Sequence, residues 1–194
     1  MKKNLLFIII AGFLLSACIA SSGLSFSKKD VKDFPNLVQN SDFEIPNDST
    51  NVLKNWTIMN DTAKKFVVLT NKESFSGKNA LEIKNPSQDV LIISDAFEID
   101  HNGGYYSYCH LKSLNKCDKK ITVFFFAFDG NGKRKDRYRE KYNISQDWKQ
   151  YDVSSGFFDR NVKYGRIIIS LPKDENQIYY LDDVESFKVY KFNK

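Results

Sequence analysis

The feature that most constrains the fold of this chain is a succession of short apolar runs interrupted by turn-forming residues. No stretch of a dozen residues has the periodicity and caps of a helix. The runs are rich in aromatic and β-branched residues, which favour strands. Ten runs qualify, at 65–70, 80–84, 90–94, 105–111, 121–128, 137–143, 149–153, 164–171, 177–181 and 184–190.

Turn signals separate these runs, among them Ser76-Gly77, Asn131-Gly132 and Pro172. Many short strands at this spacing predict an all-β sandwich or barrel. The chain has 194 residues, including 16 Phe and 10 Tyr, and it shows no internal repeat. One domain with a substantial core is therefore expected.

The first residues have the three parts of a secretory signal. Lys2 and Lys3 precede an apolar run at 5–15, and small residues then lead to Cys18. The run is too short to cross a bilayer, which takes roughly 20 apolar residues. Because the small-residue motif ends in a cysteine, the signal resembles that of bacterial lipoproteins. The alternative is an ordinary signal peptide with an incidental cysteine.

The lipoprotein resemblance implies cleavage before Cys18, lipidation of its thiol, and anchoring in the cell envelope, at the outer membrane or cell surface. We predict a signal peptide at 1–17, a lipidated cysteine with a flexible polar tether at 18–35, and a β-sandwich domain at 36–194. The net charge of +5 falls to +3 without Lys2 and Lys3, and no basic arm suggests nucleic acid as a partner.

Five motifs in sequence order resemble carbohydrate-binding modules with the galactose-binding-like jelly roll. They cover most of the chain from Asn36 to Tyr190. The resemblance implies a two-sheet antiparallel β-sandwich that binds a poly- or oligosaccharide without catalysis. The motifs are Asn36 to Glu44 followed by Trp56, Ser76-Gly77-Lys78, Tyr105 to Lys112, Asp147-Trp148-Lys149, and Tyr179 to Val184.

Two other functions remain open for such a sandwich. It also serves as a structural module or binds another envelope protein, since fold does not fix function. A glycoside hydrolase is a more distant alternative, because paired carboxylates are hard to recognise in a sequence. No Ser/His/Asp or Cys/His arrangement is visible, so we predict no catalytic residues.

The resemblance also implies one structural Ca²⁺ where the first strand, the Ser-Gly-Lys turn and the last strand meet. The carboxylates at the matching positions are Glu44 and Asp182, and backbone oxygens of Asp42, Phe75 and Lys78 would complete the shell. Such hard oxygen ligands suit Ca²⁺. The alternative is that the two carboxylates only cap surface turns.

Strand alternation divides the aromatic residues between two faces. Tyr106, Tyr108 and His110 share one face of their strand. In the next strand, Phe124, Phe126 and Phe128 occupy the face opposite the expected core, so we expect all of them on one surface of the domain. Related modules bind glycans on the corresponding concave sheet.

We predict that Tyr106 and Tyr108 stack on sugar rings, with His110 and Arg137 as hydrogen-bonding neighbours. The alternative is a second covered face, buried under loops or a partner.

The densest charge run, at 133–141, follows the Asn131-Gly132 turn. It could meet acidic polysaccharide, lipopolysaccharide phosphate or anionic lipid headgroups. The favoured alternative is a solvated edge strand that its charge protects from unwanted pairing.

Once Cys18 is lipidated, Cys109 and Cys117 remain. Cys109 lies roughly 10 Å from the end of its strand, and a disulfide needs Cα atoms within about 7 Å. We therefore expect two free thiols.

Overall fold

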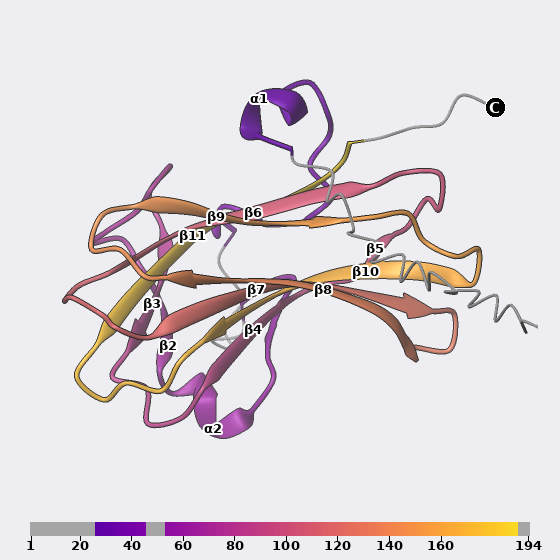
Figure 1. The fold of residues 1–194 in the computed structure, drawn as a ribbon. Coiled ribbons are helices and arrows are strands. Elements are labelled where there is room, and N and C mark those ends of the chain that lie inside the picture. The colour runs from indigo at the N-terminus through magenta and orange to yellow at the C-terminus, as the bar shows by residue number, and fades with distance from the viewer. Residues whose placement is uncertain (1–25, 46–52, 190–194) are drawn as a thin grey trace, which may run out of the picture.

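Two antiparallel β-sheets, stacked face to face, form the protein (Figure 1). The computed structural model describes residues 26–45 and 53–189, so Cys18 and the predicted signal peptide lie outside the described residues. Sheet A contains β1 (Trp56–Ile58), β4 (Val90–Ser94), β10 (Val162–Leu171), β7 (Lys120–Asp129) and β8 (Arg134–Asn143) in that order, with β5 (Phe97–Glu98) paired to β10. Sheet B contains β2 (Val67–Thr70), β3 (Ala80–Lys84), β11 (Ile178–Lys188), β6 (Tyr105–Ser113) and β9 (Lys149–Ser155).

The predicted two-sheet antiparallel sandwich is thus confirmed, and every predicted run overlaps a strand. The runs at 177–181 and 184–190 belong to one strand, β11, whose pairing with β6 shifts between Asp182 and Glu185. Asp183 lies at this bulge with a φ of 44°. The sequence analysis missed β1 and β5, which are short.

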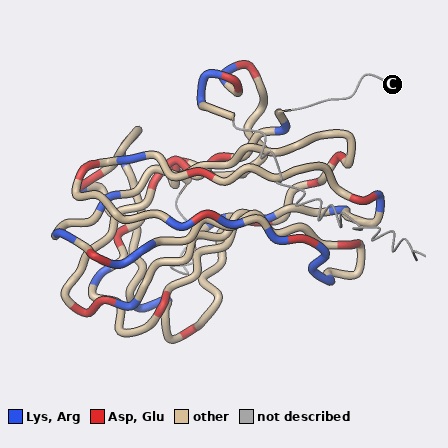
Figure 2. Tube along the Cα trace, in the orientation of Figure 1, with Lys and Arg blue, Asp and Glu red and all other residues tan. Residues whose placement is uncertain are grey.

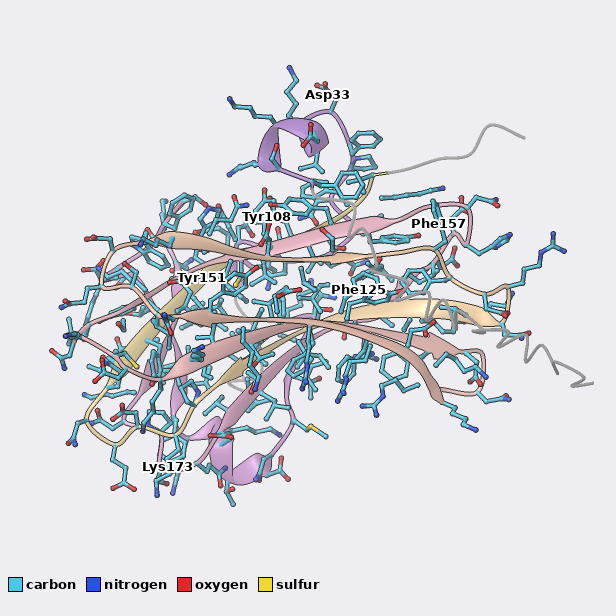
Figure 3. The ribbon with its side chains drawn as sticks, viewed as in Figure 1. Asp33, Tyr108, Phe125, Tyr151, Phe157 and Lys173 are labelled. Carbon is cyan, nitrogen blue, oxygen red and sulfur yellow. The ribbon has the colours of Figure 1, made fainter. Side chains whose placement is uncertain are left out.

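The core lies between the sheets because the strands alternate in burial. Along β7 the side chains of Ile121, Val123, Phe125 and Ala127 are fully buried. Figure 3 shows Phe125 and Tyr151 pointing into the space between the two layers. Burying one face of each sheet is the main source of stability in such a sandwich.

The segment before the first strand runs along the second half of β11. The backbone N–H of Leu37 donates to the Ser186 carbonyl at 2.8 Å, and that of Val184 donates to the Ser41 carbonyl at 2.9 Å. Because β3 pairs only with residues up to Leu181, this segment supplies hydrogen-bond partners to the rest of β11.

Two short helices complete the described structure. Helix α2 (Asp61–Lys64) follows β1, and helix α1 (Lys28–Val31) lies on the outer face of sheet B (Figure 1). Val31 of α1 is buried with Tyr106, Tyr108 and Phe187, and Phe26 packs against the same cluster. Within the predicted flexible tether at 18–35, this apolar contact thus docks Phe26 and α1 onto the sheet.

Gly165 of β10 lies where inward-facing rings of sheet A pack tightly against the strand backbone. A Cβ atom there would lie 2.7 Å from the Phe97 ring and 3.0 Å from the Phe125 ring. We expect Gly165→Ala to reduce the free energy of unfolding by about 1–3 kcal/mol through overpacking. Gly130→Ala is the matched control, since its Cβ would approach nothing closer than 3.9 Å. Equal melting temperatures of the two variants in thermal denaturation would contradict this account.

Candidate functional site

The two tyrosines predicted to stack on sugars lie on the outer face of sheet B. Each is only 1% exposed, because α1 and Phe187 cover them. Figure 3 shows Tyr108 on the side of the sheet that faces α1. The structure corrects this prediction: neither ring is free to meet a ligand. The sequence did not reveal the cover, because a four-residue helix has no detectable periodicity.

Hydrogen bonds give these tyrosines a structural role. The Tyr106 hydroxyl accepts from Gln150 Nε2 at 2.7 Å, and the Tyr108 hydroxyl donates to the Glu185 carboxylate. Burial raises the pKa of both tyrosines, since it disfavours the phenolate. Because both tyrosine hydroxyls are hydrogen-bonded, α1 can bury these rings without leaving the hydroxyls unpaired, and this stabilises its docking.

His110, predicted as a hydrogen-bonding neighbour of the ligand, is also buried in sheet B. Its ring stacks on Phe75 with centroids 3.6 Å apart, and it is 4% exposed. Its Nδ1 has no hydrogen-bond partner among the described residues and lies 3.9 Å from the Asp183 carboxylate, too far for a hydrogen bond. Burial, assisted by the positive charge of Lys28, lowers the pKa of His110 to about 4.

This shift makes stability depend on pH in a defined direction. Unfolded His110 protonates near its usual pKa of 6.5, whereas the folded form stays neutral down to about 4. The unfolded state therefore binds more protons in this window, and stability is lost as the pH falls through it. We expect His110 to account for about 3 kcal/mol of this loss.

The measurement is urea denaturation of wild type and His110→Phe between pH 7 and pH 4. The phenyl ring retains the stack on Phe75 but cannot titrate. As the pH falls, wild type should lose more stability than His110→Phe, while His101→Gln should follow wild type. Parallel curves for wild type and His110→Phe would refute the assignment.

Arg137 and the three phenylalanines lie on the other sheet, on the outer face of sheet A. The expectation that they share a surface with Tyr106 and Tyr108 is therefore wrong. The reason is topological: β6 and β7 follow one another in sequence but pair in different sheets, so their outward residues face opposite sides of the sandwich.

The outer face of sheet A carries four rows of side chains that follow the strand register. In every row a β7 residue lies between one from β10 and one from β8. β4, β1 and β5 extend three of the rows. From the start of β7 to the β7–β8 hairpin, the rows are Leu91–Ser170–Thr122–Lys141, Thr57–Ile93–Ile168–Phe124–Arg139, Arg166–Phe126–Arg137, and Glu98–Tyr164–Phe128–Arg134.

The middle of this face is an aromatic strip, defined here as Phe124, Phe126, Phe128 and Tyr164. The three phenylalanines are half-buried, and Tyr164 is 42% exposed. Ring centroids of Phe124 and Phe126 lie 5.2 Å apart, and those of Phe126 and Phe128 lie 6.3 Å apart. The sequence analysis did not select Tyr164, although alternation along 164–171 places it on the polar face.

Cations border the aromatic strip on the side of β8. Figure 2 shows Lys and Arg residues recurring along this strand and its hairpin turn. The Arg134 guanidinium lies 4.9 Å from the centroid of the Phe126 ring, a cation–π contact. Arg166 on β10 donates from Nη1 to the Ser94 carbonyl at 2.8 Å, which fixes it beside the strip. Glu98 lies at the opposite border, beyond Tyr164.

The predicted calcium ligands Glu44 and Asp182 both bind the turn at 75–79. Their carboxylates accept hydrogen bonds from backbone N–H groups of that turn. Glu44 Oε1 accepts from the N–H groups of Lys78 and Asn79 at 2.5 and 2.7 Å. Asp182 Oδ2 accepts from those of Phe75 and Ser76 at 2.8 and 3.1 Å.

These donors lower the pKa of Glu44, whereas burial raises that of Asp182 to about 6. Phe75 and Lys78 thus offer N–H groups to the carboxylates where a Ca²⁺ shell needs oxygens. The described residues contain no cluster of three or more His, Cys, Asp or Glu suited to a metal. Both carboxylates are thus engaged by backbone donors, and the calcium site with the Asp42 carbonyl stays a prediction. A melting temperature that rises with Ca²⁺ would support it.

Cys109 and Cys117 are both buried and free, as predicted. Trp56 is buried in the core, and its Nε1 donates to the Asn40 carbonyl at 2.9 Å.

Comparison with known proteins identifies the fold. No family model matches the chain, and no curated protein matches it. A family 61 carbohydrate-binding module in complex with β-1,4-galactotriose is similar, with a TM-score of 0.57 and 16% identity over 79% of this chain and 99% of that one. A family 22 xylan-binding domain from Paenibacillus barcinonensis has a TM-score of 0.54 and 16% identity over 82% and 97% of the two chains.

An arabinose-bound α-L-arabinofuranosidase is also similar, with a TM-score of 0.60 and 14% identity, but the likeness covers 79% of this chain and 26% of that enzyme. At these identities the similarity is one of fold. The chain is a β-sandwich of the jelly-roll type found in carbohydrate-binding modules.

Proposed function

We propose that this protein is a non-catalytic carbohydrate-binding domain, and that it holds a poly- or oligosaccharide on the outer face of sheet A. The observation that carries the proposal is the aromatic strip, which borders on polar side chains. Apolar faces of sugar rings stack on aromatic rings, while neighbouring polar groups bind the hydroxyls and fix orientation.

Two further observations support this choice of face. On the outer face of sheet B, α1 covers Tyr106, Tyr108 and Phe187, so these aromatic residues are already buried against the protein itself. The β7–β8 hairpin curves away from sheet B in Figure 1 and bounds the outer face of sheet A at one end. The similar folds of a galactotriose-bound module and a xylan-binding domain are consistent with such a role.

The test is a glycan-array screen with the purified full chain in detergent, followed by titration of the best ligand. Phe126 is central in the strip, so we expect Phe126→Ala to weaken binding about tenfold or more, as for an interface hot spot. The melting temperature should change little, because the ring is only half-buried.

Phe34→Ala is the matched control, since Phe34 is an exposed phenylalanine outside the strip. It should bind like wild type. The proposal fails if no glycan binds, or if both variants bind as tightly as wild type. Specific capture of another envelope protein in place of a glycan would favour the alternative of a protein-interaction module.

We further propose that the domain is anchored in the cell envelope through a lipidated Cys18. The lipoprotein-like signal supports this proposal. Among the described residues, no helix has the length and apolar character needed to cross a membrane.

Replacing the cysteine tests the anchor. We expect Cys18→Ser to leave the chain unprocessed or release it into the soluble fraction, because its thiol is the predicted site of acylation. The measurement is membrane fractionation with labelled fatty acid. Ser16→Ala, which keeps a small residue in the signal, should stay membrane-bound and labelled. A Cys18→Ser variant that remains acylated would disprove the proposal.

A further inference from the structure

We propose that the glycan bound on the outer face of sheet A is an anionic polysaccharide carrying carboxylate or sulfate groups. The inference rests on the proposed carbohydrate-binding function and names the class of ligand for the same face. It is drawn from the way in which β8 distributes its charges.

Strand β8 sorts its charges by sign between its two faces. Its outward side chains in register with the aromatic strip and Thr122 are all cationic, and they define a basic row: Arg134, Arg137, Arg139 and Lys141. The two carboxylates of the strand, Asp136 and Glu140, pair with Ala127 and Val123. Those β7 residues face the core, so both carboxylates lie on the side of β8 away from the basic row.

The basic row has no counterions within the described part of the protein. The ion pairs found there involve other lysines and His110, and none involves a member of the row. Alternate residues of a strand lie about 7 Å apart, so these like charges repel one another across that distance. Negative groups on a ligand would relieve this repulsion.

Protection of an edge strand explains part of this pattern, but not all of it. β8 is at the edge of sheet A, and charge on an edge strand discourages pairing with another chain. That purpose is served by charges of either sign on either face. It does not require that cations alone occupy the face that carries the phenylalanines.

The shape of the face favours a polysaccharide over a membrane. The outward side of β7 from Thr122 to Phe128 is about 20 Å long and lies beside the basic row throughout. A sugar chain laid along it would place apolar ring faces on β7 and acidic substituents next to β8. The hairpin that curves away from sheet B at one end would obstruct a flat bilayer (Figure 1).

The experiment compares polymers that differ only in charge. The full chain in detergent is titrated with polygalacturonate and with its fully methyl-esterified form, and then with a sulfated galactan and its desulfated form. We expect at least one charged polymer to bind more tightly than its uncharged counterpart, and high salt to remove the difference. Which pair shows the preference distinguishes carboxylate from sulfate.

Charge-removing variants locate the effect. Arg137→Gln combined with Arg139→Gln should reduce the preference by about 3- to 30-fold, the range expected for two partly exposed ion pairs. Lys84→Gln combined with Lys149→Gln is the matched control, because it removes the same charge from exposed positions on sheet B. The control should keep the wild-type preference, and melting curves establish that both double variants are folded.

The outcomes separate this inference from the proposed function. Binding of neutral glycans without any preference for charged polymers overturns the inference and leaves the proposed function intact. Equal loss of preference in both double variants also overturns it, because the attraction would then be non-specific. Tight binding to phosphatidylglycerol vesicles with no binding to charged polymers would assign the basic row to a membrane. If no glycan of any charge binds, the proposed function fails as well.

Discussion

The contact between the two sheets around Phe125 is the interaction on which the rest of this structure depends. The Phe125 ring lies 5.5 Å from the rings of Tyr105 and Phe158 and 5.8 Å from that of Phe97, measured between centroids. These partners come from both sheets and from the loop after β9, so one residue joins three parts of the core. Because side chains alternate along β7, fixing Phe125 inward also fixes Phe124 and Phe126 outward. The candidate binding face is thus a consequence of core packing.

Period-two alternation made much of the fold predictable from the sequence. It located the strands and correctly separated Phe125 from Phe124 and Phe126. It could not reveal in which sheet each strand lies, since alternation describes one strand and carries no information about its neighbours. The assignment of Tyr106 and Phe124 to one surface failed for this reason: the connection from β6 to β7 crosses between the sheets.

Local pattern also could not reveal the cover over sheet B. The segment before Asn36 is polar and short, and its contribution depends on Val31 and Phe26 meeting Tyr106 and Tyr108. Such contacts join residues more than seventy positions apart, and tertiary packing rather than helix propensity stabilises so short a helix. Beside this cover His110 is buried and Glu185 is half-buried, although charged and polar residues usually lie at the surface.

The two outer faces consequently differ in how many of their polar and charged side chains have partners within the protein. On sheet B the Glu185 carboxylate accepts from Tyr108, Gln150 donates to Tyr106, and α1 packs over both rings. On sheet A the aromatic strip stays half-buried, and the basic row has no carboxylate partner among the described residues. Repulsion between the like charges of the basic row opposes folding, because no carboxylate in the described residues balances it. A ligand with apolar ring faces and negative groups would complement this face, and this asymmetry between the sheets supports the proposal that glycans bind on sheet A.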